Sequence, residues 1–103
     1  MAGMSVLVVG GGGREHALCL GLAMSSSVSE IHCAPGNAGT AEIATNHSFS
    51  EVSDLIHLAF QLDVDFVVAG PEAPLCEGLA DQLGKMDIPC FGPVAALARL
   101  EGS

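Results

Sequence analysis

The segment SVLVVGGGGREHAL, residues 5–18, joins an apolar run to a helix-forming run through four consecutive glycines. Residues 5–9 are rich in valine and do not alternate between apolar and polar side chains, which predicts a strand buried on both faces of a parallel sheet. The glycines at 10–13 end this strand. The residues after them predict a helix that fades near the serines at 25–27, because their hydroxyl groups compete for backbone hydrogen bonds.

The rest of the chain continues the alternation of strand and helix. Strands are predicted at 30–34, 66–69 and 89–91, and helices at 52–60, around the leucines at 75, 79 and 83, and at 94–100. Ser50 is the expected N-cap of the helix at 52–60. Short connections in this order imply right-handed βαβ crossovers. The sequence therefore predicts one small α/β domain over residues 1–103, with an open parallel sheet, helices on both faces, and ligands at the carboxyl ends of the strands.

The composition narrows the class of protein. Half of the 103 residues are apolar, and twelve acidic residues against three basic ones give a net charge of −9. Three scattered cations cannot form the basic face that nucleic acid requires, so we expect no nucleic-acid partner. The apolar runs are far shorter than the ~20 residues of a membrane span, and the N-terminus lacks the basic residues of a signal peptide. We therefore expect a cytoplasmic protein with no membrane partner.

Cysteine and histidine are spread along the chain rather than clustered. The four cysteines, at 19, 33, 76 and 90, lie among apolar neighbours without CxxC spacing, which favours reduced core thiols over disulfides or a zinc site. The histidines at 32, 47 and 57 also lack metal-ligand spacing. We therefore expect no metal site, and no local grouping of side chains supports a catalytic nucleophile.

The glycine turn is the strongest chemical signal. Glycines between a buried strand and a helix let the backbone approach a ligand, and the N–H groups that open the helix bind anions such as phosphate. Gly12 and Gly13 are therefore candidate phosphate-binding residues, although a tight turn without a ligand has the same composition. Arg14 is the only cation nearby and a candidate anion contact. Glu15 repels anions, so it is expected either to fix the turn or to reach a substrate hydroxyl.

The turn does not match two common nucleotide motifs. The third glycine of the dinucleotide fingerprint is missing, and the strand at 30–34 ends without the acid that binds the adenosine ribose. No Gly-Lys-Ser/Thr follows the glycines, so the segment is not a Walker loop either. These departures disfavour a nicotinamide-dependent oxidoreductase.

Two further strand ends carry unusual sequence, PGNAGT at 35–40 and GPEAPL at 70–75. In the predicted fold, Asn37 and the group Gly70, Pro71 and Glu72 reach the same edge of the sheet as the glycine turn. An amide and a carboxylate suit sugar hydroxyls or an amine. Ordinary turn chemistry, with Glu72 complementing a helix dipole, is the alternative.

Four blocks resemble a known family in order and spacing: VVGGGGREHAL (8–18), APGNAGTA (34–41), VAGPEAPL (68–75) and FGP (91–93) with the terminal LEGS. They closely resemble the N-terminal part of the glycinamide ribonucleotide synthetases, or phosphoribosylamine–glycine ligases. This chain has Gly11 where the family usually has Asn or Ser, and its variable segments, 25–30 and 43–49, fall in predicted loops.

The resemblance implies a Rossmann-like, pre-ATP-grasp N-terminal domain of a purine-biosynthetic ligase. Such an enzyme joins glycine to 5-phosphoribosylamine with ATP and magnesium, and its N-terminal domain helps to bind phosphoribosylamine. The resemblance further implies that Gly12 and Gly13 seat the 5-phosphate and that Asn37 and Glu72 face the ribose or its amine. ATP, magnesium and glycine would bind the ATP-grasp and C-terminal domains, which this chain lacks, so the chain alone is expected to be inactive. The alternatives are the N-terminal domain of another ATP-grasp ligase and a non-catalytic sugar-phosphate-binding module.

Overall fold

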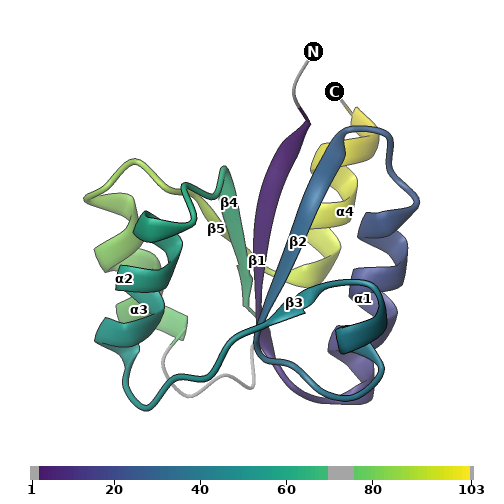
Figure 1. Ribbon diagram of the computed structural model, residues 1–103. Helices are drawn as coiled ribbons and strands as arrows, with labels where there is room; N and C mark the ends of the chain where they lie inside the picture. The colour runs from purple at the N-terminus through teal and green to yellow at the C-terminus, as the bar shows by residue number, and fades with distance from the viewer. Residues whose placement is uncertain (1–2, 70–75, 103) are drawn as a thin grey trace.

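A computed structural model describes residues 3–69 and 76–102, which form a five-stranded parallel sheet flanked by helices (Figure 1). In chain order the elements are β1 (Met4–Gly10), α1 (Gly13–Ala23), β2 (Val28–Pro35), the 3-10 helix η1 (Thr40–Glu42), β3 (Thr45–Asn46), α2 (Val52–Gln61), β4 (Phe66–Ala69), α3 (Cys76–Gly84), β5 (Cys90–Phe91) and α4 (Pro93–Gly102). The predicted α/β class and open parallel sheet are confirmed. Leu75, expected in the third predicted helix, lies outside the described residues.

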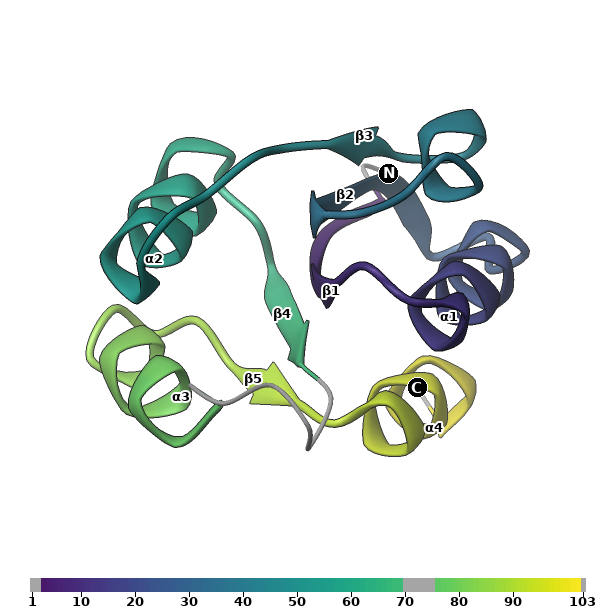
Figure 2. The same ribbon diagram turned by 90° about the horizontal axis from the view of Figure 1, so that it is seen from below.

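The strand order is β3-β2-β1-β4-β5, with β1 at the centre of the sheet. Val8 of β1 lies opposite Cys33 of β2 on one side and opposite Val68 of β4 on the other. The chain moves outward from β1 through β2 to β3 and then returns to the other side of β1 with β4. The carboxyl ends of β1 and β4 therefore flank the point where the order reverses, which is where open α/β sheets bind ligands. Figure 2 looks onto this edge of the sheet.

The side chains of β1 alternate between two hydrophobic layers. Leu7 and Val9 pack in the layer of α2 and α3, whereas Val6 and Val8 pack in the layer of α1 and α4. The helices add Leu55, Ala59, Leu79 and Leu83 to the first layer and Leu18, Cys19, Leu22 and Ala96 to the second. Figures 1 and 2 show these helix pairs on opposite faces of the sheet. Because both layers exclude water, β1 needs no polar face, which explains its continuous apolar sequence.

One segment of the fold differs from its prediction. Residues 40–46, expected as a loop, form η1 and then the two-residue strand β3. Thr45 and Asn46 of β3 pair with His32 and Cys33 of β2. A polar pair of residues carries no hydrophobic period, so this strand depends on the partner strand rather than on its own sequence.

The N-cap prediction for α2 was also wrong. Glu51, not Ser50, is the N-cap residue. The side chain of Asp54 reaches back, and its Oδ2 accepts hydrogen bonds from the backbone N–H groups of Ser50 (2.9 Å) and Glu51 (3.0 Å). One carboxylate thus satisfies two backbone donors, which leaves the Ser50 hydroxyl without a capping role.

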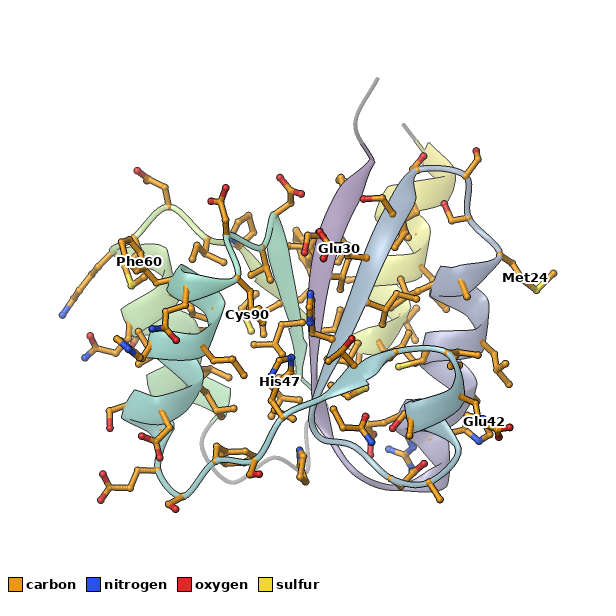
Figure 3. All side chains as sticks on the ribbon, viewed as in Figure 1. Met24, Glu30, Glu42, His47, Phe60 and Cys90 are labelled. Carbon is orange, nitrogen blue, oxygen red and sulfur yellow. The ribbon has the colours of Figure 1, made fainter. Side chains whose placement is uncertain are left out.

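Large apolar side chains are exposed at separate places on the described part of the chain. Met24, after α1, and Phe60, on α2, point outward on opposite sides of the molecule (Figure 3). Scattered exposure of this kind is ordinary for a water-exposed surface. None of the helices in residues 3–69 and 76–102 combines the length and apolar character of a bilayer span.

Candidate functional site

The glycine turn leads from β1 into α1 at the carboxyl edge of the sheet. Gly10 has a φ of +138°, a conformation that glycine adopts far more readily than other residues. A Cβ atom on Gly10 would also lie 2.6 Å from Cγ and Cδ of Glu15. Both the backbone conformation and the approach of Glu15 therefore require glycine at the start of the turn.

The side chain of Glu15 stabilises the glycine turn through a hydrogen bond. Glu15 is only 7% exposed, and its Oε1 accepts a hydrogen bond of 2.8 Å from the backbone N–H of Gly12, the N-cap of α1. A carboxylate in the first turn also interacts favourably with the helix dipole. Glu15 therefore fixes the turn, one of the two roles considered from the sequence. Its contact with a substrate hydroxyl stays a prediction.

Several backbone N–H groups lie at the start of α1. The first intrahelical bond joins the N–H of His16 to the carbonyl of Gly12, at 3.2 Å. The N–H groups of the first helical residues, which begin with Gly13, come before this bond in the chain and point out of the N-terminal end of α1. Gly13 and the side chain of Arg14 are exposed, and a Cβ on Gly13 would meet no atom within 4 Å. The geometry can accept an anion, as helix N-termini in α/β folds commonly do.

Asn37, which follows β2, meets the glycine turn as the sequence predicted. Its Nδ2 donates hydrogen bonds to the carbonyls of Gly11 (3.0 Å) and Gly12 (3.1 Å), and its Oδ1 accepts one from the N–H of Thr40 (2.9 Å). The amide hydrogens of Asn37 thus point into the turn. Its contact with a ribose or an amine stays a prediction, whereas its support of the glycine turn is a direct observation.

Thr40 and Asn46 complete this loop, and sequence reasoning missed both. Thr40 is fully buried, and its Oγ1 accepts a hydrogen bond from the N–H of Asn37 (2.7 Å) and lies 2.8 Å from Oδ1 of Asn46. Asn46 Nδ2 donates to the carbonyl of Asn37 (2.8 Å). No local pattern marks Asn46, because it lies in a segment that reads as a variable loop. Its role emerges only from the pairing of β3 with β2.

The glycine turn and the loop after β2 approach each other closely. The N–H of Gly36 donates to the carbonyl of Gly10 (3.1 Å), and a Cβ on Gly11 would lie 2.9 Å from the carbonyl oxygen of Gly36. Gly11 is the position at which the family resemblance noted from the sequence implies Asn or Ser. In this chain the missing side chain allows the two backbones to touch, and any larger residue at 11 requires the loop to shift.

The third predicted group of site residues, Gly70, Pro71 and Glu72, lies outside the described residues. The structure therefore brings two of the three predicted loops together, the glycine turn and the loop that carries Asn37. The meeting of the third loop with them stays a prediction.

A buried pair of thiols joins α1 and β2, two of the elements that carry the site. Cys19 of α1 and Cys33 of β2 are both fully buried free cysteines, with their sulfur atoms 3.2 Å apart. The hydrogen bond with Cys33 and burial both raise the pKa of Cys19 well above its ordinary value. Cys19 therefore stays protonated at physiological pH, and both cysteines pack in the layer of α1 and α4, as predicted for these two residues.

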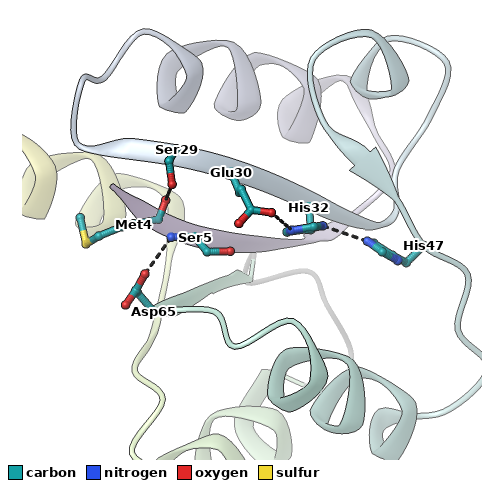
Figure 4. A network of polar contacts seen from close by, with 7 residues as sticks. All are labelled: Met4, Ser5, Ser29, Glu30, His32, His47 and Asp65. Carbon is teal, nitrogen blue, oxygen red and sulfur yellow. Dashed lines mark hydrogen bonds and ion pairs between the residues drawn. The ribbon is translucent and has the colours of Figure 1, made fainter. Parts of the chain in front are cut away.

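Two histidines that lack metal-ligand spacing in the sequence meet at the β2–β3 edge (Figure 4). His32 Nδ1 lies 3.0 Å from His47 Nε2, and His32 Nε2 lies 3.4 Å from Oε1 of Glu30. Burial, and then the neighbouring His32, lower the pKa of His47. Among the residues that the structure describes, no group of three or more His, Cys, Asp or Glu side chains could hold a metal ion.

These features define an α/β domain whose glycine turn, braced by a carboxylate and an amide, can bind an anion at the carboxyl edge of the sheet. Residues 4–101 match the family model described as "Phosphoribosylglycinamide synthetase, N domain", and the chain belongs to this family.

Curated relatives carry a consistent name. The chain is 51% identical over 102 residues to "Phosphoribosylamine--glycine ligase" of Streptomyces coelicolor and 46% identical over 102 residues to the protein of the same name from Caldanaerobacter subterraneus. Each comparison covers 97% of this chain and 24% of the relative, so the chain spans about a quarter of their length. A crystal structure of the Thermotoga maritima phosphoribosylamine–glycine ligase is similar with a TM-score of 0.48 and 30% identity, over 69% of this chain and 17% of that chain.

Proposed function

We propose that this chain is the N-terminal domain of a ligase that joins the amine of 5-phosphoribosylamine to the carboxyl group of glycine in purine biosynthesis. The family match over residues 4–101 carries the proposal, because it includes the glycine turn and the loop of Asn37. The name shared by relatives up to 51% identical to the chain supports it. The domain's task in this reaction is to bind and orient phosphoribosylamine.

The 5-phosphate binds at the glycine turn. The N–H of Gly12 already donates to Glu15, so the phosphate is bound by the N–H groups of Gly13 and Arg14 and by the Arg14 guanidinium. Gly12 contributes by having no side chain between the phosphate and the backbone. Glu15 keeps the turn in shape.

The ribose and its amine lie farther along the same edge. Gly70, Pro71 and Glu72 follow β4 and provide backbone groups and a carboxylate toward the sugar. Asn37 follows β2 and, because its Nδ2 group donates to the glycine turn, it meets the sugar only through the second lone pair of its Oδ1. A carboxylate near the amine holds it beside the glycine carboxyl group, which is the geometry that amide formation needs.

ATP and Mg²⁺ belong to the larger protein in this proposal. ATP supplies the energy that activates the glycine carboxyl group. Among the described residues, no group of three or more His, Cys, Asp or Glu side chains could hold a metal ion. ATP, magnesium and glycine bind parts that correspond to the remaining three quarters of the relatives.

A domain replacement tests this function. The S. coelicolor ligase is produced with its matching N-terminal segment replaced by residues 1–103, and the formation of glycinamide ribonucleotide from ATP, glycine and phosphoribosylamine is measured. We expect turnover by the chimera and none by the 103-residue chain alone. A folded chimera that binds ATP and glycine but forms no product contradicts the proposal, as does turnover by the isolated chain.

The same chimera tests whether Glu72 binds near the amine of phosphoribosylamine. Glu72→Gln should raise the KM for phosphoribosylamine several-fold while leaving the KM for ATP unchanged, because the substitution removes the charge near the amine. An unchanged KM for phosphoribosylamine removes Glu72 from the site. Lys85→Gln, on the segment after α3, serves as a control for a loss of charge away from the glycine turn.

A further inference from the structure

We propose that Thr40 and Asn46 are positioning residues that orient the phosphate-binding glycine turn through Asn37. This proposal rests on the proposed function, since it concerns how that phosphate site is held. The hydrogen bonds described for Thr40 and Asn46 go to Asn37 and to each other. Their effect passes through hydrogen bonds that Asn37 makes on both of its sides.

The side chains of Thr40 and Asn46 and the backbone of Asn37 form a closed ring of hydrogen bonds. The Thr40 hydroxyl accepts from the N–H of Asn37 (2.7 Å), and its single hydrogen has two acceptors within reach, Oδ1 of Asn46 (2.8 Å) and the carbonyl of Asn37 (3.0 Å), of which Asn46 is the nearer. Asn46 Nδ2 then donates to the carbonyl of Asn37 (2.8 Å). The backbone N–H and C=O of Asn37 are thus both held, and Thr40 N–H holds its Oδ1 as well. Only the Nδ2 group of Asn37 is left to point elsewhere.

That group points at the glycine turn, where it fixes two peptide planes. Asn37 Nδ2 donates to the carbonyls of Gly11 and Gly12. A peptide group is planar and trans, so its C=O and N–H point in opposite directions. Holding the Gly11 carbonyl directs the Gly12 N–H toward Glu15, which accepts it. Holding the Gly12 carbonyl directs the Gly13 N–H away from Asn37, as a donor for the phosphate.

The residues around the ring are arranged closely about it. Thr40 is fully buried, and Gly36 has a φ of +75°. A Cβ on Gly36 would collide with Asn46 Oδ1 and lie 2.8 Å from Thr40 Oγ1. The strand β3 places Asn46 opposite Cys33 of β2 and so delivers its amide to the ring. All ring members are uncharged, so they add no repulsion toward a phosphate in a chain of net charge −9.

The test compares isosteric variants of the 103-residue chain with ribose 5-phosphate as the probe. Thr40→Val keeps the buried shape and removes the hydroxyl, whereas Thr40→Ser keeps the hydroxyl. By NMR titration, Thr40→Val should weaken binding by about three- to tenfold, which corresponds to about 0.7–1.4 kcal/mol. Thr40→Ser should stay within about twofold of the unmodified chain. Asn46→Ala, at a half-buried position, should weaken binding like Thr40→Val and serves if the valine variant does not fold.

A control distinguishes positioning from general destabilisation. Val64→Ala lies in the layer of α2 and α3, on the opposite face of β1 from the thiol pair, and should lower the melting temperature without weakening binding. The proposal is overturned if Thr40→Val and Asn46→Ala bind like the unmodified chain, or if Val64→Ala weakens binding as much as they do.

NMR spectra of the free protein, recorded without ligand, test this proposal independently of the proposed function. If the unmodified chain does not bind ribose 5-phosphate, the proposed phosphate site fails. The positioning proposal still requires that Thr40→Val and Asn46→Ala shift the amide resonances of Gly12 and Gly13 and the side-chain resonance of Asn37 in the free protein. Unmoved resonances, or equal shifts in Val64→Ala, overturn it.

Discussion

Single residues of the glycine run have distinct tasks despite their identical chemistry. Gly10 combines a positive φ with close contact to Glu15, whereas Gly13 faces open space at the first position of α1. Gly10→Ala should therefore destabilise the chain by about 1–3 kcal/mol, the usual cost of a strained backbone conformation. Gly13→Ala should be neutral or stabilise by up to ~1 kcal/mol, because alanine favours the helix and restricts the unfolded chain. Urea unfolding of both variants measures the difference, and equal losses would contradict the described turn.

His47 gives the chain a pH-dependent term in stability. Burial and His32 lower its pKa in the folded state, so the unfolded chain, with a histidine pKa of about 6.5, binds a proton more readily. Stability should therefore fall as the pH drops through and below that value, and it is fully present above it. His47→Gln should make the free energy of unfolding less dependent on pH between about 5 and 7. Gln82→Ala, an exposed change on α3 that removes no titratable group, is the control and should keep the original dependence. An identical slope in both variants would be the contrary result.

At the scale of elements, acidic side chains accept backbone hydrogen bonds at the N-termini of two helices. Asp54 accepts hydrogen bonds from the backbone of Ser50 and Glu51, which lower its pKa, as Glu15 accepts one from Gly12. Asp54→Ala should fray the first turn of α2 and speed amide hydrogen exchange at 50 and 51, because these donors lose their acceptor. In the unmodified chain the same fraying should appear only as the pH falls through the lowered pKa of Asp54. Asp81→Ala, an exposed change on α3, should leave exchange at 50 and 51 unaltered, and protection that survives Asp54→Ala would argue against this cap.

The sequence predicted the elements that have a strong hydrophobic pattern. The continuous valines of β1 and the apolar stripe of α2 indicate burial directly, and the glycine run identifies the turn between β1 and α1. The strand β3 could not be predicted, because its two polar residues become a strand only through pairing with β2. The cap of α2 was misassigned because serine and a nearby aspartate offer competing acceptors, and only the backbone geometry decides between them.

The candidate site was predictable to the same extent. The glycines and the asparagine after β2 can be predicted from residue type alone, since both residue types are common where a chain turns. The ring of Thr40 and Asn46 depends on a contact between residues on separate elements, which no local pattern contains. The meeting of His32 with His47 escaped prediction for the same reason, because only the pairing of β2 and β3 brings them together.

On the scale of the whole molecule, net charge and site chemistry oppose each other. A net charge of −9 repels a phosphorylated ligand at long range. Under the proposed function, local backbone N–H groups and Arg14 would have to supply the attraction, and we expect binding by this chain alone to be weak. The two-layer core accounts for a rigid edge on which such a site is held.

Titration of the ¹⁵N-labelled 103-residue chain with ribose 5-phosphate, and with ribose as the control, tests the central claim most directly. We predict saturable shifts of the Gly13 and Arg14 amide resonances with ribose 5-phosphate, at millimolar or lower concentration, and no shift of these resonances with ribose. The absence of saturable shifts at Gly13 and Arg14, or the same shifts with ribose, would contradict a phosphate site at the glycine turn.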